Sequence, residues 1–435
     1  MPDDDDPAAF VSDRLGGLLA PESEMLRAAG LAADEADLIA AKRRSLSDPV
    51  VRQLARERFA GLWDEPEPAP TEADERGSER RGRALAAFAV AAAVAVRLPE
   101  AFGFGLVDSD DAGFYARNVS LLVLAPLGGW FVWLKRPPHW ATAVIVAVFA
   151  ASAAVINAYP FDDDGSTFVL AALHLPVLLW LVLGLARTGA CWRLSDQRMD
   201  YVRFTGEMSV YYVLIALAGA VFSALTVGAF VALDVDTRWM TEWVMVAGAA
   251  GAVVVTAWLV EFWAGAVSKF ASMLAYIFTP LFAAMLVVFL VAVPATGRSI
   301  EGEREALILF NVMLGFVVGL LLFYGAARRP SDRPGFFDGA ATVLAAAGLL
   351  TGVLTFAAVI GRIADFGWSP NRAAIAGINA IFLVNLAGSV WLCMALWRRQ
   401  RPFDDLVRWQ TAHFVIYAAW AGIVVVAFPP IFGFA

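Results

Sequence analysis

The sequence predicts an all-α, polytopic membrane protein, and two features of its composition point to this fold class. Hydrophobic residues make up 60% of the chain and charged residues only 17%, whereas a soluble domain usually carries about 25% charged residues. The apolar residues also gather into long runs, and a bilayer core needs roughly 20 consecutive apolar residues in a helix. A transmembrane β-barrel would instead show short segments of alternating polarity, which this sequence lacks.

The apolar runs predict about eleven membrane spans behind a short polar region. They cover approximately residues 84–106, 114–134, 140–160, 167–186, 209–233, 242–262, 272–294, 305–326, 339–360, 373–396 and 411–430. Residues 1–63 hold short amphipathic stretches, which predict a small acidic head of helices. Residues 64–83 are rich in Pro and charge without apolar periodicity, which is typical of a disordered linker. We therefore expect a head (1–63), a linker (64–83) and a transmembrane domain (84–435).

The distribution of basic residues predicts how the spans are oriented. Residues 1–80 carry a net charge of −9 and the rest of the chain a net charge of +1. If the head is cytoplasmic, sixteen of the 23 basic residues after residue 80 fall in cytoplasmic loops, as the positive-inside rule requires. The head is then inside and the C-terminus outside. High Ala content and only three lysines are typical of a bacterium with a GC-rich genome, so the expected location is a bacterial cytoplasmic membrane.

Several classes of activity leave no trace in the sequence. No lysine is followed by Ser or Thr, so the phosphate-binding loop of nucleotide hydrolases is missing. His139, His174 and His413 are isolated and show no metal-ligand spacing, and Cys191 and Cys393 are too far apart for a disulfide framework. We expect no metal, no cofactor and no nucleic-acid partner, and no enzymatic activity is predicted from a motif.

Three segments in the second half of the chain resemble a known family. They are YVRFTGEMSVYYVLIAL (201–217), AYIFTPLFAAMLVVFLVAV (275–293) and GRIADFGWSPNRAAIAGINAIFLVNL (361–386). Together they resemble a bacterial family of multi-pass membrane proteins catalogued only as a domain of unknown function, the family numbered 4153. The matching positions are Arg203, Gly206, Glu207, Phe278, Pro280, Leu281, Arg362, Ile363, Gly367, Asn371 and Arg372. This chain has Phe366 where the family usually has Tyr, and Ser369 where it has Thr. The resemblance implies many membrane helices but no particular activity.

The stretch GRIADFGWSPNR (361–372) is the strongest candidate for a site, because it places two arginines on the predicted outer face. Gly367 can end a helix with a positive φ, and Ser369 and Pro370 are suited to begin the next one. One interpretation is a tight turn in which Asp365 pairs with Arg362. The other is an anion site, in which Arg362, Arg372, Asn371 and the helix N-terminus bind an anionic solute or a lipid headgroup. The sequence leaves both open.

Polar residues within the other spans are weaker candidates, since ionisable groups in a membrane are costly and often functional. Arg203, Glu207, Glu261 and His174 are retained as candidate ligand-binding residues, although dipole compensation, interfacial location or a core hydrogen bond would also account for them. Arg97 is expected to pair with Glu100. Asn157, Asn311, Asn379 and Asn385 are interpreted as interhelical hydrogen-bonding residues, and the pairs Gly315/Gly319 and Gly348/Gly352 as sites of close helix packing.

Three functions are compatible with these features. The leading hypothesis is permease-like transport of a small or lipidic solute without an ATPase of its own. The second is a membrane-embedded transferase acting on a lipid-linked substrate at the outer face, with Asp108, Asp110 or Asp111 binding a metal. The third is a non-catalytic scaffold or sensor whose head recruits a cytoplasmic protein. A continuous polar cavity reaching the membrane midplane would favour transport, and an outer cleft in which these aspartates converge on a metal would favour the transferase. A solid apolar core would favour the scaffold.

Overall fold

The structure, a computed structural model, describes Glu24, Arg27 and residues 72–104, 112–162, 165–231, 237, 244–262, 266–296, 304–328 and 333–435. The chain divides into two units, Met1–Arg81 and Gly82–Ala435, which are considered separately. In the first unit Glu24 and Arg27 are helical, and residues 72–81 begin a long helix. The other residues of the predicted head, and residues 64–71 of the predicted linker, lie outside the described residues.

Every regular element in the described residues is a helix, which confirms the predicted fold class. The long helices are α5 (Glu72–Arg97), α6 (Ala112–Lys135), α7 (His139–Ala158), α8 (Ser166–Thr188), α9 (Ser195–Val231), α10 (Val246–Phe262), α11 (Ala266–Thr296), α12 (Arg304–Ala327), α13 (Phe336–Phe366), α14 (Pro370–Trp397) and α15 (Phe403–Val426). Three short helices, η1 (Leu98–Phe102), η2 (Gly189–Arg193) and α16 (Phe428–Ile431), complete the set. Ten of the described helices are long and apolar enough to cross a membrane, and α10 is a shorter apolar helix. The chain is an integral membrane protein.

The described part of the predicted linker is helical and corrects that prediction. α5 begins at Glu72, so residues 72–83 continue directly into the first span instead of forming a disordered segment. The window 72–83 contains Glu and Arg residues but no Pro, and long charged side chains are good helix formers. The polarity of this segment was therefore a poor guide to its conformation.

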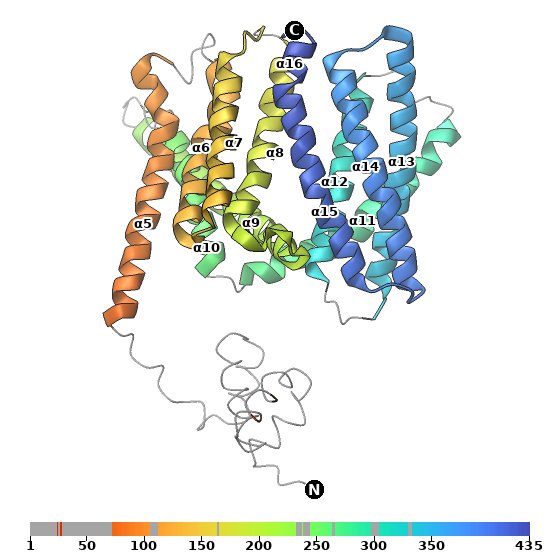
Figure 1. Ribbon diagram of the computed structural model, residues 1–435, viewed down its shortest axis with the longest axis horizontal. Coiled ribbons are helices and arrows are strands. Elements are labelled where there is room, and N and C mark those ends of the chain that lie inside the picture. Colours follow the sequence, from red (N-terminus) through yellow and green to blue (C-terminus); the bar gives the residue numbers. More distant parts are fainter. Residues whose placement is uncertain are drawn as a thin grey trace. The chain divides into compact units, whose positions relative to one another are not determined.

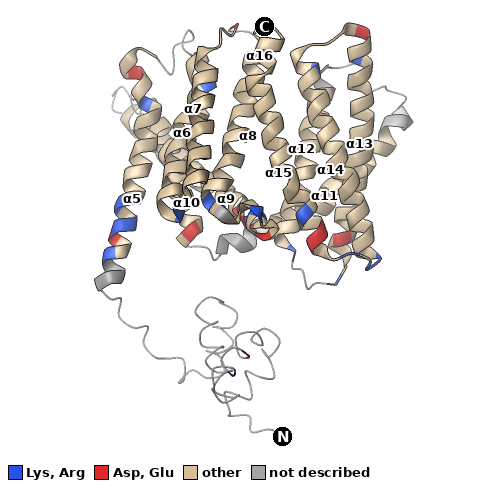
Figure 2. Cartoon of the chain, in the orientation of Figure 1, with Lys and Arg blue, Asp and Glu red and all other residues tan. Residues whose placement is uncertain are grey.

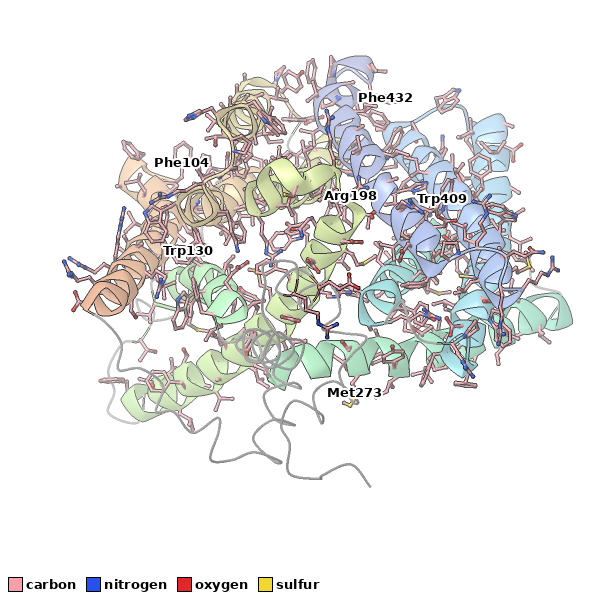
Figure 3. All side chains as sticks on the ribbon, turned by 60° about the horizontal axis from the view of Figure 1, so that its bottom comes forward. Phe104, Trp130, Arg198, Met273, Trp409 and Phe432 are labelled. Carbon is pink, nitrogen blue, oxygen red and sulfur yellow. The ribbon has the colours of Figure 1, made fainter. Side chains whose placement is uncertain are left out.

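The transmembrane unit consists of two groups of helices with separate apolar cores. The first core joins residues of α5, α6, α7, α8 and α10 with Val425 of α15, and the second joins residues of α11 to α15. α9 connects the two groups, because Tyr201 and Phe204 pack in the first core while Met199 and Val202 pack in the second. Figure 1 shows the two groups side by side, and Figures 1 and 3 show α9 and α11 running obliquely away from each other.

The two ends of the helix bundle differ in their contents. We call "upper end" the end that holds the α13–α14 loop and the start of α8, and "lower end" the end that holds the α14–α15 loop (Figure 1). Near the upper end a small apolar cluster of Leu170, Ala374, Val424 and Phe428 joins α8 to α14, α15 and α16. Lysines and arginines gather mostly at the lower ends of the helices (Figure 2). This asymmetry agrees with the alternation of basic loops in the sequence.

Glycines set how closely α13 and α14 approach their neighbours. A Cβ atom added at Gly348 would lie 2.7 Å from a methyl of Val317 on α12, and one added at Gly352 would lie 3.0 Å from a methyl of Leu383 on α14. Close packing at this pair was predicted and is confirmed. For Gly315 and Gly319 the prediction is wrong, because a Cβ at Gly315 would only reach Phe382 at 4.0 Å and one at Gly319 would meet no atom within 4 Å.

A buried ion pair fixes the lower ends of α12 and α13 to each other. Arg328 Nε donates a 2.6 Å hydrogen bond to Asp338 Oδ1, and the hydroxyl of Tyr324 donates a second one of 2.6 Å to the same oxygen. The backbone N–H of Gly335 donates to Asp338 Oδ2 at 2.8 Å, and the Arg328 guanidinium stacks 4.5 Å from the Phe403 ring. Side chains of Arg328 and Asp338 are 3% and 8% exposed. Each carboxylate oxygen therefore has a donor.

Removing the charge of Asp338 should destabilise the protein strongly, because Arg328 would keep a buried charge without its partner. We expect Asp338→Asn to lower the free energy of unfolding by about 3–5 kcal/mol, measured by thermal or denaturant unfolding in lipid nanodiscs. Asp365→Asn, at an exposed carboxylate near the upper end, serves as the matched control and should leave stability unchanged. Equal stability of the two variants would contradict a stabilising role for the ion pair.

Candidate functional site

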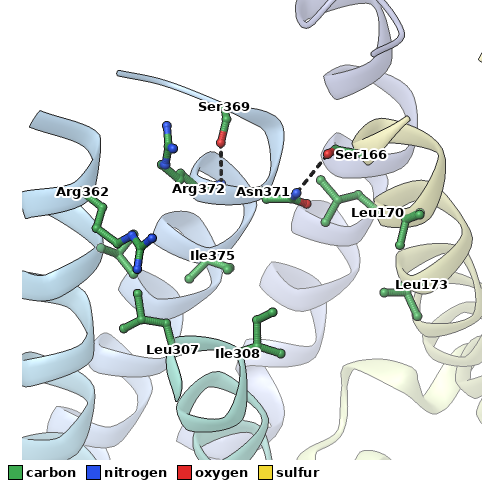
Figure 4. A pocket seen from close by; sticks show the side chains of 12 residues that line it. Ser166, Leu170, Leu173, Leu307, Ile308, Arg362, Ser369, Asn371, Arg372 and Ile375 are labelled. Atoms are coloured by element: carbon green, nitrogen blue, oxygen red, sulfur yellow. Dashed lines mark hydrogen bonds between the residues drawn. The ribbon is translucent and has the colours of Figure 1, made fainter. Parts of the chain in front are cut away.

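A cavity of about 600 Å³ lies near the upper end, between the two groups of helices. One wall is formed by α8 of the first group, and the others by α12, α13 and α14 of the second (Figure 4). The lining residues are Ser166, Val169, Leu170, Leu173, Leu307, Ile308, Val359, Arg362, Ser369, Asn371, Arg372 and Ile375. The volume lies within the range of about 300–1,000 Å³ that is usual for sites of small molecules. Three of the predicted site residues, Arg362, Asn371 and Arg372, line it together.

The α13–α14 loop forms as the sequence predicts. α13 ends at Phe366, and Gly367 follows with a φ of 74°, which favours glycine. Ser369 is the N-cap of α14, its hydroxyl oxygen accepting a 3.4 Å hydrogen bond from the backbone N–H of Arg372, and Pro370 is the first helical residue. This loop brings the last helical turn of α13 and the first helical turn of α14 to the same rim of the cavity.

Arg372 belongs to the turn. Its Nη1 donates hydrogen bonds to the carbonyl oxygens of Phe366 at 3.1 Å and Gly367 at 2.8 Å, and its guanidinium lies 5.6 Å from the Phe366 ring. The last carbonyls of a helix have no partner within that helix, so Arg372 satisfies groups at the end of α13. In Figure 4 its side chain points toward the loop and away from Leu307 and Ile308.

Arg362 is different, because it points into the cavity and has no hydrogen bond or ion pair with another described residue. Its Nη1 is buried without a hydrogen-bond partner, and the side chain extends from α13 toward α14 above Leu307 (Figure 4). Asp365 is exposed and forms no ion pair with it among the described residues. The predicted Arg362–Asp365 pair is therefore absent. A buried donor atom without a partner is costly, and an anion in the cavity would remove that cost.

Asn371 links the two groups of helices across the rim of the cavity. Its Nδ2 donates a 3.0 Å hydrogen bond to Ser166 Oγ, at the first residue of α8 (Figure 4). Ser166 was not predicted as a site residue, because 205 positions separate it from Asn371 and nothing local in the sequence marks the contact. Opening the cavity by separating α8 from α14 would break this hydrogen bond.

The deeper walls of the cavity are apolar. Val169, Leu170 and Leu173 contribute from α8, and Leu307 and Ile308 from α12. Ser166 to Leu173 spans about 10 Å along α8 at 1.5 Å per residue, less than half of a hydrocarbon core of about 30 Å. The cavity is therefore shallow compared with the thickness of a membrane. A charged rim above an apolar interior suits an amphiphilic anion, with its acidic group at Arg362 and its chain between α8 and α12.

The candidate residue Glu261 lies at the lower end in a second, fully paired cluster. Arg187 Nε donates to Glu261 Oε1 at 2.7 Å, and Lys135 Nζ donates to Glu261 Oε2. The Glu261 side chain is 7% exposed, and the Arg187 guanidinium lies 4.5 Å from the Phe204 ring. The three charges join the ends of α6, α8 and α10, so Glu261 stabilises a helix junction. Its cationic partners were not predicted.

The remaining candidates lie apart from the cavity. Arg203 on α9 donates to the carbonyl oxygen of Ala326 at 2.6 Å and to Asp200 at 2.7 Å, which ties α9 to the end of α12. Glu207 is half-buried one turn further along α9. His174 Nδ1 lies 2.8 Å from the carbonyl oxygen of Leu170 in its own helix. The eight candidates therefore divide between the upper end, the lower end and the interior of α8, and no single site unites them.

The aspartates of the transferase hypothesis, Asp108, Asp110 and Asp111, lie outside the described residues. Within the described residues, no group of three or more His, Cys, Asp or Glu side chains could hold a metal ion. Among known proteins, no family model, no curated protein and no solved structure matches this chain. The resemblance of its three segments to the uncharacterised bacterial family therefore stays a prediction.

The different contacts of the two arginines predict different effects on stability. Arg372→Gln removes a charged donor from two carbonyls at the end of α13 and should lower the free energy of unfolding by about 1–3 kcal/mol. Arg362→Gln removes a charge without a partner, so it should change stability by about 0.5 kcal/mol or less. Thermal unfolding of both variants without added ligand tests this difference. A loss at Arg362→Gln equal to that at Arg372→Gln would contradict it.

Proposed function

We propose that this integral membrane protein is permease-like and admits an anionic amphiphile through the cavity at its upper end. The observation that carries the proposal is the buried, unpartnered Nη1 of Arg362 in a cavity with apolar walls. Guanidinium groups bind phosphate and carboxylate with paired hydrogen bonds, and the N-terminus of α14 beside the cavity adds a favourable dipole for an anion. The apolar walls would cover the chain of the same molecule.

The position of the cavity favours transport over the two other hypotheses. It lies between two groups of helices that each have an apolar core of their own, joined by α9 and by Val425 of α15. Ligand sites at the interface of two helix groups are usual in transporters, where one group moves against the other. We further propose that the upper end faces outward and that the chain belongs to the bacterial family that it resembles.

An alkyl phosphate should bind wild-type protein and stabilise it against unfolding. At 100 times its dissociation constant, a ligand specific for the folded state adds about 2.7 kcal/mol, which thermal unfolding in neutral-lipid nanodiscs resolves. The probe is dodecyl phosphate, compared with inorganic phosphate and with a neutral alkyl glycoside of the same chain. Because Arg362 and the apolar walls both contribute to binding, we expect the alkyl phosphate to stabilise the protein most.

Variants of arginine separate binding at the cavity from general charge effects. Arg362→Gln should lose the stabilisation by dodecyl phosphate, whereas Arg398→Gln, an exposed arginine at the lower end, should retain it. Arg362→Lys keeps the charge without the planar group and should retain part of it. Equal stabilisation of wild type and Arg362→Gln would overturn the assignment of the anion to Arg362.

The proposed orientation predicts which loops are reachable from outside the cell. In a protein with Cys191→Ser and Cys393→Ala, a cysteine at Trp368, which is 69% exposed in the α13–α14 loop, should react with an impermeant maleimide added to intact cells. A cysteine at Gln400, exposed in the α14–α15 loop, should react only after lysis. Labelling of the Gln400 position in intact cells would reverse the proposed orientation.

A further inference from the structure

A layer of polar side chains lies one helical turn deeper than the cavity, on the three helices of the second group that line it. The cavity is lined by Leu307 and Ile308 on α12, by Val359 on α13 and by Ile375 on α14. Residues three to four positions apart on a helix occupy the same face. One turn further toward the lower end, these faces carry Asn311, Thr355 and Asn379.

Contacts one turn below that layer establish that the three residues share a level. A Cβ atom added at Gly352 on α13 would lie 3.0 Å from Leu383 on α14 and 3.5 Å from Leu314 on α12. One helical turn nearer the upper end, Gly352 is followed by Thr355 on α13, Leu383 by Asn379 on α14, and Leu314 by Asn311 on α12. Because α13 runs opposite to α12 and α14, the same step in space is a forward step on α13 and a backward step on the others.

Two of these side chains have buried polar atoms without partners. Asn379 and Thr355 are 0% exposed, and neither Nδ2 nor Oδ1 of Asn379 has a hydrogen-bond partner. Asn311 donates from Nδ2 to the carbonyl oxygen of Leu307 in its own helix at 2.7 Å, while its Oδ1 is buried without a partner. Leaving a buried polar group unpaired costs about 1–3 kcal/mol. The interhelical bonds predicted for Asn311 and Asn379 are therefore absent.

Below the polar layer the three helices pack closely at two glycines of α13. Leu314 and Leu383 meet at Gly352, and Val317 and Leu386 meet at Gly348, where an added Cβ would lie 2.7 Å from Val317 and 3.6 Å from Leu386. Leu314, Val317 and Leu386 are 1%, 0% and 0% exposed. These residues form an apolar plug of two layers. Further down the same faces, Arg328, Tyr324 and Asp338 form the buried ion-pair cluster at the lower end.

We propose that Asn311, Thr355 and Asn379 form a second binding position, deeper than the cavity and above the plug, for a group that both donates and accepts hydrogen bonds. The two unpaired Oδ1 atoms need donors and the unpaired Nδ2 of Asn379 needs an acceptor. A hydroxyl group meets both needs, whether it belongs to the solute or to a water molecule. The position deepens the proposed function, on which it rests, by placing the next stage of the solute's path along α13.

Cysteine accessibility tests this position without any knowledge of the solute. In the Cys191→Ser, Cys393→Ala protein in lipid nanodiscs, cysteines are placed one at a time at Asn379, Asn311 and Thr355. Leu386→Cys, on the same helix as Asn379 and equally buried, is the matched control below the plug. A small hydrophilic methanethiosulfonate is added, and loss of the free thiol is followed by mass spectrometry after confirming that each variant is folded.

We expect the thiols at 379 and 311 to be lost while the thiol at 386 remains. Protection of all three layer positions, to the same extent as position 386, would overturn the proposal, and modification of 386 as fast as 379 would overturn the plug. Because no alkyl phosphate is used, this result is independent of the binding test at Arg362. If the three layer positions are protected while alkyl phosphate binds at Arg362, only the deeper position is refuted.

A pair of fatty acids distinguishes the two sources of the hydroxyl. Arg362 and Thr355 are seven residues apart, about 10 Å along α13, so an ω-hydroxy fatty acid of matching length could reach both positions. If the solute supplies the hydroxyl, this acid should bind about three- to tenfold more tightly than the same acid without it, and Asn379→Leu should abolish the difference. Equal affinity of the two acids, together with modification at 379, assigns the position to water.

Discussion

The close approach of α13 to α12 and α14 at Gly348 and Gly352 is the contact on which the second helix group depends. No side chain other than hydrogen fits at these positions without displacing Val317 or Leu383. In a membrane, helices associate through such close packing because lipid offers no hydrophobic driving force between them. The two glycines place the plug near the middle of α13, and they align the faces of the three helices above and below it.

The buried polar groups that the structure describes differ in whether they have hydrogen-bond partners. At the lower end, Glu261 binds two cations and Asp338 binds Arg328 and Tyr324, so these buried carboxylates are satisfied. Near the upper end, Arg362 and Asn379 retain buried atoms without partners. Hydrocarbon supplies no water to satisfy such groups. Toward the lower end, Arg198 Nε and Trp130 Nε1 are also buried without partners, so the buried carboxylates, and not all polar groups, distinguish that end.

Several contacts join the two helix groups around the cavity. α9 links their cores near the lower end through Tyr201 and Met199, and a small cluster with Leu170 joins them near the upper end. The bond from Asn371 to Ser166, one helical turn above Leu170, closes the rim. The Tyr159 hydroxyl also donates to the carbonyl oxygen of Val426, and the backbone N–H of Thr167 donates to that of Ala435. The plug lies within the second group, so separating the two groups does not open it.

The sequence was sufficient for the spans and the α13–α14 turn, because both follow from local patterns. Gly367, Ser369 and Pro370 act where their backbone preferences predicted, and Asn157 and Asn385 form the expected interhelical bonds, to Asn118 and Gln410. Arg97 likewise pairs with Glu100. Three-dimensional neighbours were not predictable. The patterns of Gly315/Gly319 and Gly348/Gly352 are identical in sequence, yet only the second pair faces a partner helix.

The same limit explains the errors at the site. The spacing of Arg362 and Asp365 favours an ion pair, but Asp365 is exposed and does not line the cavity. Asn311 and Asn379 resemble the other asparagines in the sequence, and only the register of α12, α13 and α14 shows that they lie together without partners. Ser166 belongs to the site because it contacts Asn371, which lies 205 positions away in the sequence. Local spacing predicts which residues share a helix face, and packing decides what that face meets.

The central claim is that Arg362 holds an anion in an apolar-walled cavity, and a density map of the protein in lipid nanodiscs tests it most directly. The account predicts elongated non-protein density in the cavity, with one end within hydrogen-bonding distance of the Arg362 guanidinium and the rest between α8 and α12. An empty cavity with the Arg362 guanidinium bonded to a protein carbonyl or to Asp365 would contradict it.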